Sequence, residues 1–487
     1  MRKPRLARLQ LYCTFVCFVM VGCSTVTDDS SAKIEKLMDT YHQFGQFKGT
    51  VLVAHDNKVI FTKAYGEANR EWQVKNTIDT KYRLGSATKS FTAALVMKLA
   101  QDSLLRIDAT ISEYLPDFRA DVGQKVTLHN LLTHSSGIPM PTMTSDQYWN
   151  FFQQQWTTSQ LIDNLCSEDL AFEPGSQFRY SSAGFILLGA IVEQVKGKPY
   201  EDVLNEYIFG PYNMQNTGFD YPEMIIPHRA QGYQTNYGLG NARYKYMPSS
   251  HASGALYSTV EDLFKWDQVL RSSHLLNDKS KTMMNSAQFS TPISSIGLGW
   301  FVDTLQVSDS IQTRVYHGGD VSGFSAFYVR VLETGDFVAL LSNQEGISGH
   351  KIAYSLLDLL NGIAPEIPQE LLSDVLRNTY FSSGLEAMNK MFNQIQSKTL
   401  STYLIDEDEL VELGYDILMI GATKAACDVF EISIQLNPNS SNAYDSYGEG
   451  LLAYGDTIGA IKNYSKSLQL DPENVNASII LGKLRSN

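Results

Sequence analysis

The pair of residues best suited to covalent chemistry is Ser86 and Lys89, which lie three positions apart just before an amphipathic helical stretch over residues 91–99. Residues three positions apart share one face of a helix, so we expect the lysine beside the serine hydroxyl. Burial lowers the pKa of a lysine, and a neutral lysine can accept the serine proton. Ser-x-x-Lys recurs at Ser30 and Ser348, but only Ser86 stands at a predicted helix amino terminus. Ser86 is therefore the candidate nucleophile; the alternative is that it only caps the helix.

Short motifs on both sides of this pair follow one another in an order typical of one superfamily. They lie at residues 47–53, 64–69, 82–89, 127–137, 173–182, 254–259, 297–300 and 317–319. This ordered set covers nearly all of residues 32–345 and resembles the serine β-lactamase and penicillin-binding-protein superfamily, specifically its class C-like branch. The sequence has no Ser-Asp-Asn motif, which argues against the class A-like branch.

The resemblance implies an α+β fold of the β-lactamase/transpeptidase type, with an antiparallel sheet flanked by helices and a helical subdomain. The residue pattern agrees with this fold. Strand-like runs occur early, at 49–54 and 58–64, and again late, at 327–332 and 337–342. Because strands stand at both ends of the module 32–360, we expect its two termini to close one sheet.

The resemblance also implies a role for each site residue. Ser86 would attack a carbonyl to form an acyl-enzyme, and Lys89 and Tyr180 would move the proton to the leaving group. The backbone N–H groups of Ser86 and Asp320 would form the oxyanion hole. Gly319 would let the substrate backbone lie close to the strand. The expected substrate is a small molecule, peptide or ester with a reactive carbonyl.

Two positions depart from the superfamily pattern. Ser182 stands where Asn is usual, and Ser is a shorter side chain that holds the lysine and a substrate amide less well. His317 stands where classical penicillin-binding enzymes have Lys. Histidine is mostly neutral at pH 7, so we expect weaker binding of a substrate carboxylate. β-Lactamase, D,D-peptidase and esterase activities all remain open, and we expect an ester to be turned over most readily.

Charge and motif content exclude other classes of function. The net charge is −13, and the first 23 residues carry four positive charges and no acid, which leaves −17 on the rest of the chain. Such an acidic chain is a poor partner for nucleic acid. No His-Glu-x-x-His or GxxxxGK[ST] motif occurs, and no cofactor is predicted. Cys166 and Cys427 lie in different predicted modules, so two buried free thiols are favoured over a bridge between them.

The amino terminus predicts export. Four basic residues precede an apolar run at 11–22 that is too short to span a bilayer, and the run ends at Cys23. The sequence around Cys23 resembles a bacterial lipobox, which implies that residues 1–23 are a lipoprotein signal peptide. Cys23 would then be lipidated, become the first residue after cleavage and anchor the exported protein to a bacterial membrane, on the periplasmic side or at the outer membrane. Ordinary cleavage to a soluble secreted form is the alternative. Residues 24–31 are expected to form a polar tether.

The carboxyl end carries an internal repeat with a period of 34 residues. The matched positions are Gly414, Gly448 and Gly482, then Ala426 and Ala460, Phe430 and Tyr464, and Pro438 and Pro472. This pattern resembles the tetratricopeptide repeat, an α-helical array, over residues 404–487. Two repeats and a final helix are few for a stable array, so we expect it to dock on the preceding domain or to bind a protein partner. Residues 361–403 are expected to form a connector. A protein that works only through these repeats, without catalysis, is the competing hypothesis.

Overall fold

The computed structural model describes residues 26–235, 239–292, 294–307 and 310–486. Cys23 lies outside these residues. Helix α1 spans Val26–Gln43 and begins close to the predicted lipidation site. Residues 26–31 belong to this helix, whereas the sequence predicted that they form part of a tether. The helix is held by a buried face that includes Ile34 and Met38. In the part of the chain that the structure describes, no helix has the length and apolar character that a membrane span requires.

Within the described residues, eight antiparallel strands form one sheet in the order β10-β11-β12-β13-β14-β15-β1-β2. Their bounds are β10 Phe289–Ser290, β11 Ser295–Ile296, β12 Phe301–Val307, β13 Ser310–Val321, β14 Phe324–Val331, β15 Phe337–Ser342, β1 Gly49–His55 and β2 Lys58–Tyr65. The first strand of the module pairs with β15, with Gly49 opposite Ser342. The prediction that the two ends of the module close one sheet is therefore confirmed.

The early hairpin has the local chemistry that the sequence indicates. Asp56 and Asn57 join β1 to β2 with φ angles of 49° and 60°. Both residues tolerate positive φ, and a two-residue turn of this kind matches the right-handed twist of the strands. The run 49–54 is buried at every position, because helices cover both faces of the sheet at β1.

Helices cover the sheet from both sides. On one face lie α1 and α12 (Gly349–Leu360), whose apolar residues pack on Val51, Val53 and Leu340. On the other face lie α2 (Thr88–Gln101), α8 (Ser182–Lys196) and α10 (Val260–Arg271), which share a core with Leu52 and Tyr328. Because successive strand residues point to opposite faces, Val51 and Leu52 belong to different cores.

The remaining elements of this module are short. The helices are α3 (Ile111–Tyr114), α4 (Ala120–Gly123), α5 (Leu128–Leu132), α6 (Ser145–Phe152), α7 (Thr158–Leu165), α9 (Tyr200–Leu204) and α11 (Asp278–Asn285). The strands are β3 (Glu67–Asn69), β4 (Val74–Lys75), β5 (Tyr82–Arg83), β6 (Gly218–Phe219), β7 (Tyr233–Gln234), β8 (Gly240–Asn241) and β9 (Leu256–Ser258). Strands β5, β9 and β6 form a small sheet beside the amino terminus of α2.

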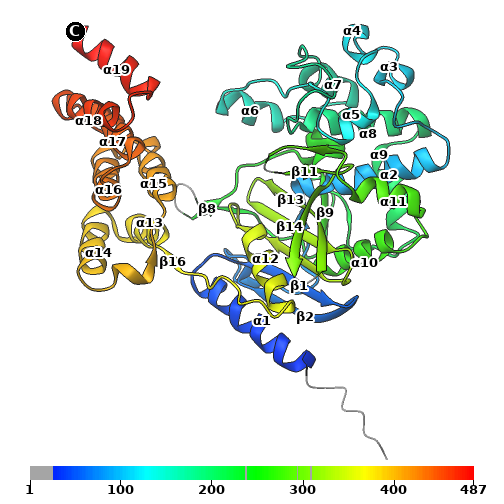
Figure 1. Ribbon diagram of the computed structural model, residues 1–487, viewed down its shortest axis with the longest axis horizontal. Helices are drawn as coiled ribbons and strands as arrows, with labels where there is room; N and C mark the ends of the chain where they lie inside the picture. The colour runs from blue at the N-terminus through cyan, green and yellow to red at the C-terminus, as the bar shows by residue number, and fades with distance from the viewer. Residues whose placement is uncertain (1–25, 236–238, 293, 308–309, 487) are drawn as a thin grey trace, which may run out of the picture.

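The carboxyl-terminal helices stand beside this module, coloured yellow to red in Figure 1. They are α13 (Leu372–Ser383), α14 (Leu385–Lys398), α15 (Glu407–Met419), α16 (Thr423–Leu436), α17 (Ser441–Tyr454), α18 (Thr457–Leu470) and α19 (Val475–Ser486). The periodic glycines allow neighbouring helices to approach closely. A Cβ at Gly414 would lie 2.3 Å from the ring of Phe430, and one at Gly448 would lie 3.0 Å from the ring of Tyr464.

The segment expected to be a connector is part of this helical unit. Leu376 of α13 and Phe392 of α14 share one buried cluster with Leu413 of α15 and Phe430 of α16. The two-residue strands β16 (Glu370–Leu371) and β17 (Tyr403–Leu404), which flank α13 and α14 in the sequence, pair in parallel. The repeat motif does not extend into residues 361–403, so the sequence shows no sign of this additional hairpin. The extra pair of helices supplies the apolar surface that the repeats alone lack.

This packing predicts that Leu376→Ala destabilises the carboxyl-terminal unit by about 2–5 kcal/mol, because it leaves a cavity in a shared core. Thermal unfolding followed by circular dichroism should show an earlier loss of helix, while the sheet-containing module keeps its own transition. Met419→Ala is the control, because Met419 is largely exposed. An unchanged unfolding curve for Leu376→Ala would show that the connector does not support the repeats.

Candidate active site

Ser86 and Lys89 lie side by side. Ser86 occupies a 3₁₀ turn, Gly85–Ala87, that leads directly into α2, so Lys89 follows in the first turn of that helix. The Lys89 Nζ lies 3.1 Å from the Ser86 Oγ and donates a second hydrogen bond of 2.8 Å to the carbonyl oxygen of Ser253. The helical spacing that favoured this pair therefore produces the contact.

The surroundings of Lys89 favour its neutral form. The side chain is fully buried. Burial, and to a lesser extent the positive charge of Lys245, lower the pKa of Lys89 to about 7. The aromatic rings of Tyr180 and Phe185 lie 5.0 and 5.7 Å from the Nζ. At neutral pH a substantial fraction of Lys89 is thus able to accept a proton.

Tyr180 lies beside Lys89 and precedes α8 in the sequence. Its residue is 39% exposed, so it borders the opening of the site rather than the core. Desolvation raises the pKa of the phenol, the charge of Asp320 adds to this rise, and an interaction with the Ser86 hydroxyl opposes it. The phenol stays protonated at neutral pH. It can therefore donate a proton or a hydrogen bond next to Ser86, but it is a poor base.

His134 supports Tyr180 from below. It adopts a φ of 54°, as residues in tight turns do. Its Nδ1 accepts a 3.2 Å hydrogen bond from the backbone N–H of Ser181, and its ring stacks on Tyr180 with centroids 4.4 Å apart. Burial and the charge of Lys89 hold the pKa of His134 well below its ordinary value. A neutral ring adds no further positive charge beside Lys89.

The backbone of β13 lies directly against the turn that carries Ser86. A Cβ at Gly319 would stand 2.1 Å from the Leu84 carbonyl oxygen and 2.6 Å from the Ser86 nitrogen. Gly85, with a φ of 50°, makes the reciprocal approach, since a Cβ there would lie 3.0 Å from the Asp320 carbonyl oxygen. Neither position has room for a side chain. The two backbones expected to supply the oxyanion hole are thus adjacent.

His317 is neutral and has one unused nitrogen. It is 2% exposed, and its Nδ1 lies 2.6 Å from the carbonyl oxygen of Gly318. That contact makes Nδ1 the protonated nitrogen, because only an N–H can donate to a carbonyl. Burial, then the charge of Lys89, lowers the pKa of His317 to about 3. The Nε2 is buried and has no hydrogen-bond partner among the described residues.

Asp320 and Ser182 complete the predicted set. Asp320 follows Gly319 on β13, and its carboxylate accepts a hydrogen bond of 2.5 Å from the Ser325 hydroxyl. Ser182 is the first residue of α8, two positions after Tyr180, and is half-buried. A carboxylate at position 320 and a neutral His317 give this part of the site no fixed positive charge.

A family model described as Beta-lactamase matches residues 32–360. The chain belongs to the β-lactamase family. A curated relative, penicillin-binding protein 4* of Bacillus subtilis, is 27% identical over 336 residues, which cover 64% of this chain and 71% of the relative.

Solved structures share the fold of this β-lactamase-family chain. The octameric penicillin-binding protein homologue from Pyrococcus abyssi is 26% identical, with a TM-score of 0.61. The matched region covers 71% of this chain and 81% of the chain of the homologue. The D-amino acid amidase from Ochrobactrum anthropi SV3 is 24% identical, with a TM-score of 0.59. The matched region covers 69% of this chain and 99% of the amidase chain. The second likeness shows the fold alone. Members of this superfamily are serine hydrolases.

The β-lactamase-family site contains a second buried lysine that no motif indicated. Lys245 is almost fully buried, its Nζ lies 3.1 Å from the Tyr148 hydroxyl, and it stands 4.2 Å from the centroid of the Phe152 ring. Burial, then the charge of Arg83, lowers the pKa of Lys245 to about 8. It lies 156 positions from Lys89 in the sequence, and tertiary folding alone brings the two charges close enough to interact.

These pKa shifts predict the pH dependence of Ser86 acylation. The rate of labelling by a fluorophosphonate should rise with pH around a midpoint of about 7, as Lys89 loses its proton and becomes a base. Lys245→Met removes a repulsive charge, so the pKa of Lys89 should rise and the midpoint should move to higher pH. At pH 7 the labelling rate should fall by up to about tenfold, the effect of one pKa unit.

The matched control is Lys462→Met, an exposed lysine of α18. It should leave both the midpoint and the rate unchanged. A Lys245→Met profile that coincides with that of the unsubstituted protein, in a folded variant, would show that Lys245 does not tune Lys89.

Proposed function

We propose that this chain is a serine hydrolase that acts through an acyl-enzyme on Ser86 and prefers ester substrates. The observation that carries the proposal is the 3.1 Å contact between the Ser86 Oγ and the buried Lys89 Nζ. A lysine whose pKa is lowered to about 7 can take the serine proton at neutral pH. A residue that only capped a helix would have no need of a buried amine.

The reaction follows from the positions of these groups. The Ser86 Oγ attacks the substrate carbonyl carbon while Lys89 takes its proton, and the carbonyl oxygen becomes an oxyanion near the backbone N–H groups of Ser86 and Asp320. As the tetrahedral intermediate collapses, the bond to the leaving group breaks. Tyr180 donates a proton to that group and regains one from Lys89. Water then attacks the acyl carbon while Lys89 takes its proton. The ester bond to Ser86 breaks, and Lys89 returns the proton to the Ser86 Oγ.

The preference for esters rests on the charges around the acyl-binding region. A substrate carboxylate gains nothing from a neutral His317, and the carboxylate of Asp320 repels it. The unused Nε2 of His317 is an acceptor, so it favours a substrate that offers a hydrogen-bond donor or none at all. Esters without a carboxylate meet these conditions.

Amide or β-lactam hydrolysis, including D-Ala-D-Ala peptidase activity, is the second candidate. The description of the relative from Bacillus subtilis as a penicillin-binding protein and that of the amidase from Ochrobactrum anthropi favour it. Esters and amides share the acyl-enzyme route, and they differ in how firmly the substrate must be held. Ser182, in place of the usual Asn, offers less to an amide carbonyl.

The substrate preference is tested with a short-chain p-nitrophenyl ester, nitrocefin and a D-Ala-D-Ala peptide under identical conditions. We expect the highest kcat/KM for the ester, because His317 stands where classical penicillin-binding enzymes have Lys and offers no positive charge to a carboxylate. Ser86→Ala should abolish turnover and fluorophosphonate labelling without loss of the fold. Efficient hydrolysis of nitrocefin with negligible esterase activity would support the second candidate. No labelling of the folded protein by a fluorophosphonate or a fluorescent penicillin would favour a protein that works only through its carboxyl-terminal helices.

The proposal extends to location. A lipid-modified Cys23 would hold the exported enzyme on a bacterial membrane, with α1 starting only a few residues from the anchor. Expression in bacteria fed an alkyne fatty acid should label the protein at the membrane. Cys23→Ser should lose the label and release the protein in soluble form. Equal labelling of both forms, or none of either, would contradict the anchor.

We also propose that the carboxyl-terminal helices are tetratricopeptide repeats that bind a protein partner. The 34-residue period supports this identification, as does the repetition of one contact in successive units, Gly414 against Phe430 and Gly448 against Tyr464. The additional hairpin α13–α14 brings the number of helix pairs in the described part of the unit to three. That is the size at which such arrays bury a continuous core.

A further inference from the structure

A second cavity, separate from the site of Ser86, lies between the large sheet and helices α10 and α11. Its volume is about 900 Å³. Charged and polar side chains from four strands and both helices line it, among them Arg271, Lys281, Asn285, Thr304, Thr313 and Arg330. Neither Ser86, Lys89 nor Tyr180 takes part in its lining. The proposed hydrolase reaction therefore makes no use of this cavity.

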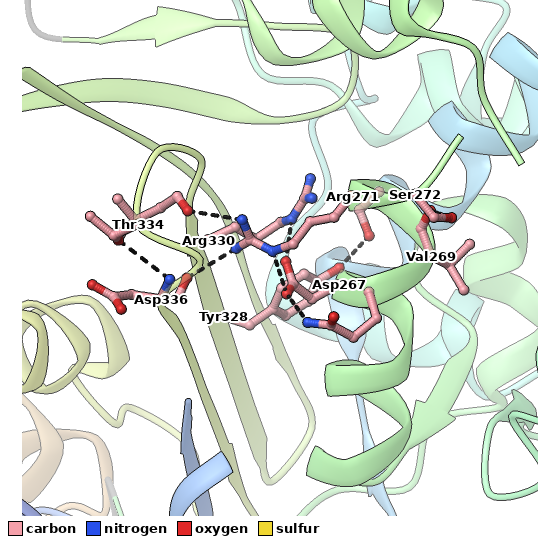
Figure 2. Close-up of polar contacts among 11 residues, drawn as sticks. Asp267, Val269, Arg271, Ser272, Tyr328, Arg330, Thr334 and Asp336 are labelled. Carbon is pink, nitrogen blue, oxygen red and sulfur yellow. Dashed lines mark hydrogen bonds and ion pairs between the residues drawn. The ribbon is translucent and has the colours of Figure 1, made fainter. Parts of the chain in front are cut away.

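The floor of the cavity contains two arginines that share one carboxylate. The Nε of Arg330 lies 2.7 Å from the Asp267 Oδ1, and the Nε of Arg271 lies 2.8 Å from the Oδ2. Figure 2 shows both guanidinium groups converging on Asp267. The other hydrogen bonds of Arg271 go to the backbone carbonyls of Val331 and Asp336, which carry no charge. Among these hydrogen bonds, Asp267 supplies the one carboxylate that the two guanidinium groups share.

Arg330 has a hydrogen-bond donor that is not satisfied. It is 1% exposed, and its Nη1 is buried with no hydrogen-bond partner among the residues that the structure describes. A buried unpaired guanidinium N–H is costly, and a carboxylate is the partner that matches its planar fork best. Asn285, at the end of α11, also lines the cavity with a buried and unpartnered Oδ1. The site thus offers a strong donor and a separate acceptor.

The rim has the opposite charge. Asp56, Asp278 and Glu333 line the cavity and are exposed. Asp278 pairs with Lys281, and Asp303, a further lining residue, already pairs with Arg314. Asp56 and Glu333 have no cationic partner among the described ion pairs. An acidic rim repels polyanions such as phosphate esters and attracts an ammonium group.

We propose that this cavity binds a small zwitterion, an amino acid or the end of a short peptide, with its carboxylate on Arg330 and its ammonium toward Asn285 and the acidic rim. The carboxylate accepts a hydrogen bond from the unused Nη1 of Arg330, and the amine supplies a donor for the Asn285 oxygen. Hydrogen bonding and the charge of the rim then agree with one class of ligand, and the cavity has room for it.

The test titrates glycine, acetate and inorganic phosphate into the full chain carrying Ser86→Ala, which silences the proposed active site, at constant ionic strength in a calorimeter. Glycine should bind saturably and more tightly than acetate, and phosphate should bind most weakly. Arg330→Met keeps the volume of the side chain and leaves Asp267 paired with Arg271, so the fold should survive. It should weaken glycine binding by at least about tenfold, the scale of one charge-assisted hydrogen bond.

A second pair of variants tests the orientation of the ligand. Glu333→Gln should reduce the preference for glycine over acetate, because it removes a rim charge while keeping the shape. Arg106→Gln, an exposed arginine on a distant loop, should change neither affinity. No saturable binding of glycine would overturn the proposal, as would equal binding to the Arg330→Met variant in its folded form. Tighter binding of phosphate than of glycine would overturn the assignment to a carboxylate.

Discussion

The proposed chemistry of the site depends on the exclusion of water from the Lys89 amine. Lys89 has no solvent exposure, and the hydrogen bonds described for its amine go to the Ser86 hydroxyl and the Ser253 carbonyl. Aromatic rings lie near it at longer range. Water around the amine would restore the ordinary pKa of Lys89, and the lysine could no longer act as the proposed base at neutral pH. Helix α8, which carries Phe185, the loop with Tyr180 and the segment that ends at Ser253 all enclose this amine. These segments come from distant parts of the chain and meet around the Lys89 amine.

The second requirement is that two backbones touch. The turn of Ser86 and strand β13 approach so closely that neither Gly85 nor Gly319 could carry a side chain. This contact sets the position of Ser86 relative to His317 and Asp320. The strand is held in turn by β14, where Gly319 pairs with Ala326. The sheet therefore positions Ser86, the proposed nucleophile, through backbone contact, while the helices enclose the lysine proposed to take its proton.

Buried positive charge is handled in two different ways in this module. Lys89 and Lys245 are both buried, and burial lowers the pKa of each. Under the sheet, Arg271 and Arg330 cannot lose a proton at any physiological pH, so they share Asp267 instead. A lysine with a lowered pKa can act as a base. An arginine with an unused N–H can instead hold an anionic ligand.

The sequence alone determined the features that rest on local spacing. The hairpin of β1 and β2 follows from its turn residues, the contact of Ser86 with Lys89 follows from the three-residue spacing, and the contacts of Gly414 and Gly448 follow from the 34-residue period. Only the tertiary structure decided the rest. Lys245, the shared carboxylate of Asp267 and the packing of α13 with α15 depend on residues that no pattern links, and residues 26–31 are helical because of a face buried further along α1. Local spacing specifies neighbours on one element, whereas desolvation and charge depend on what the folded chain places around a residue.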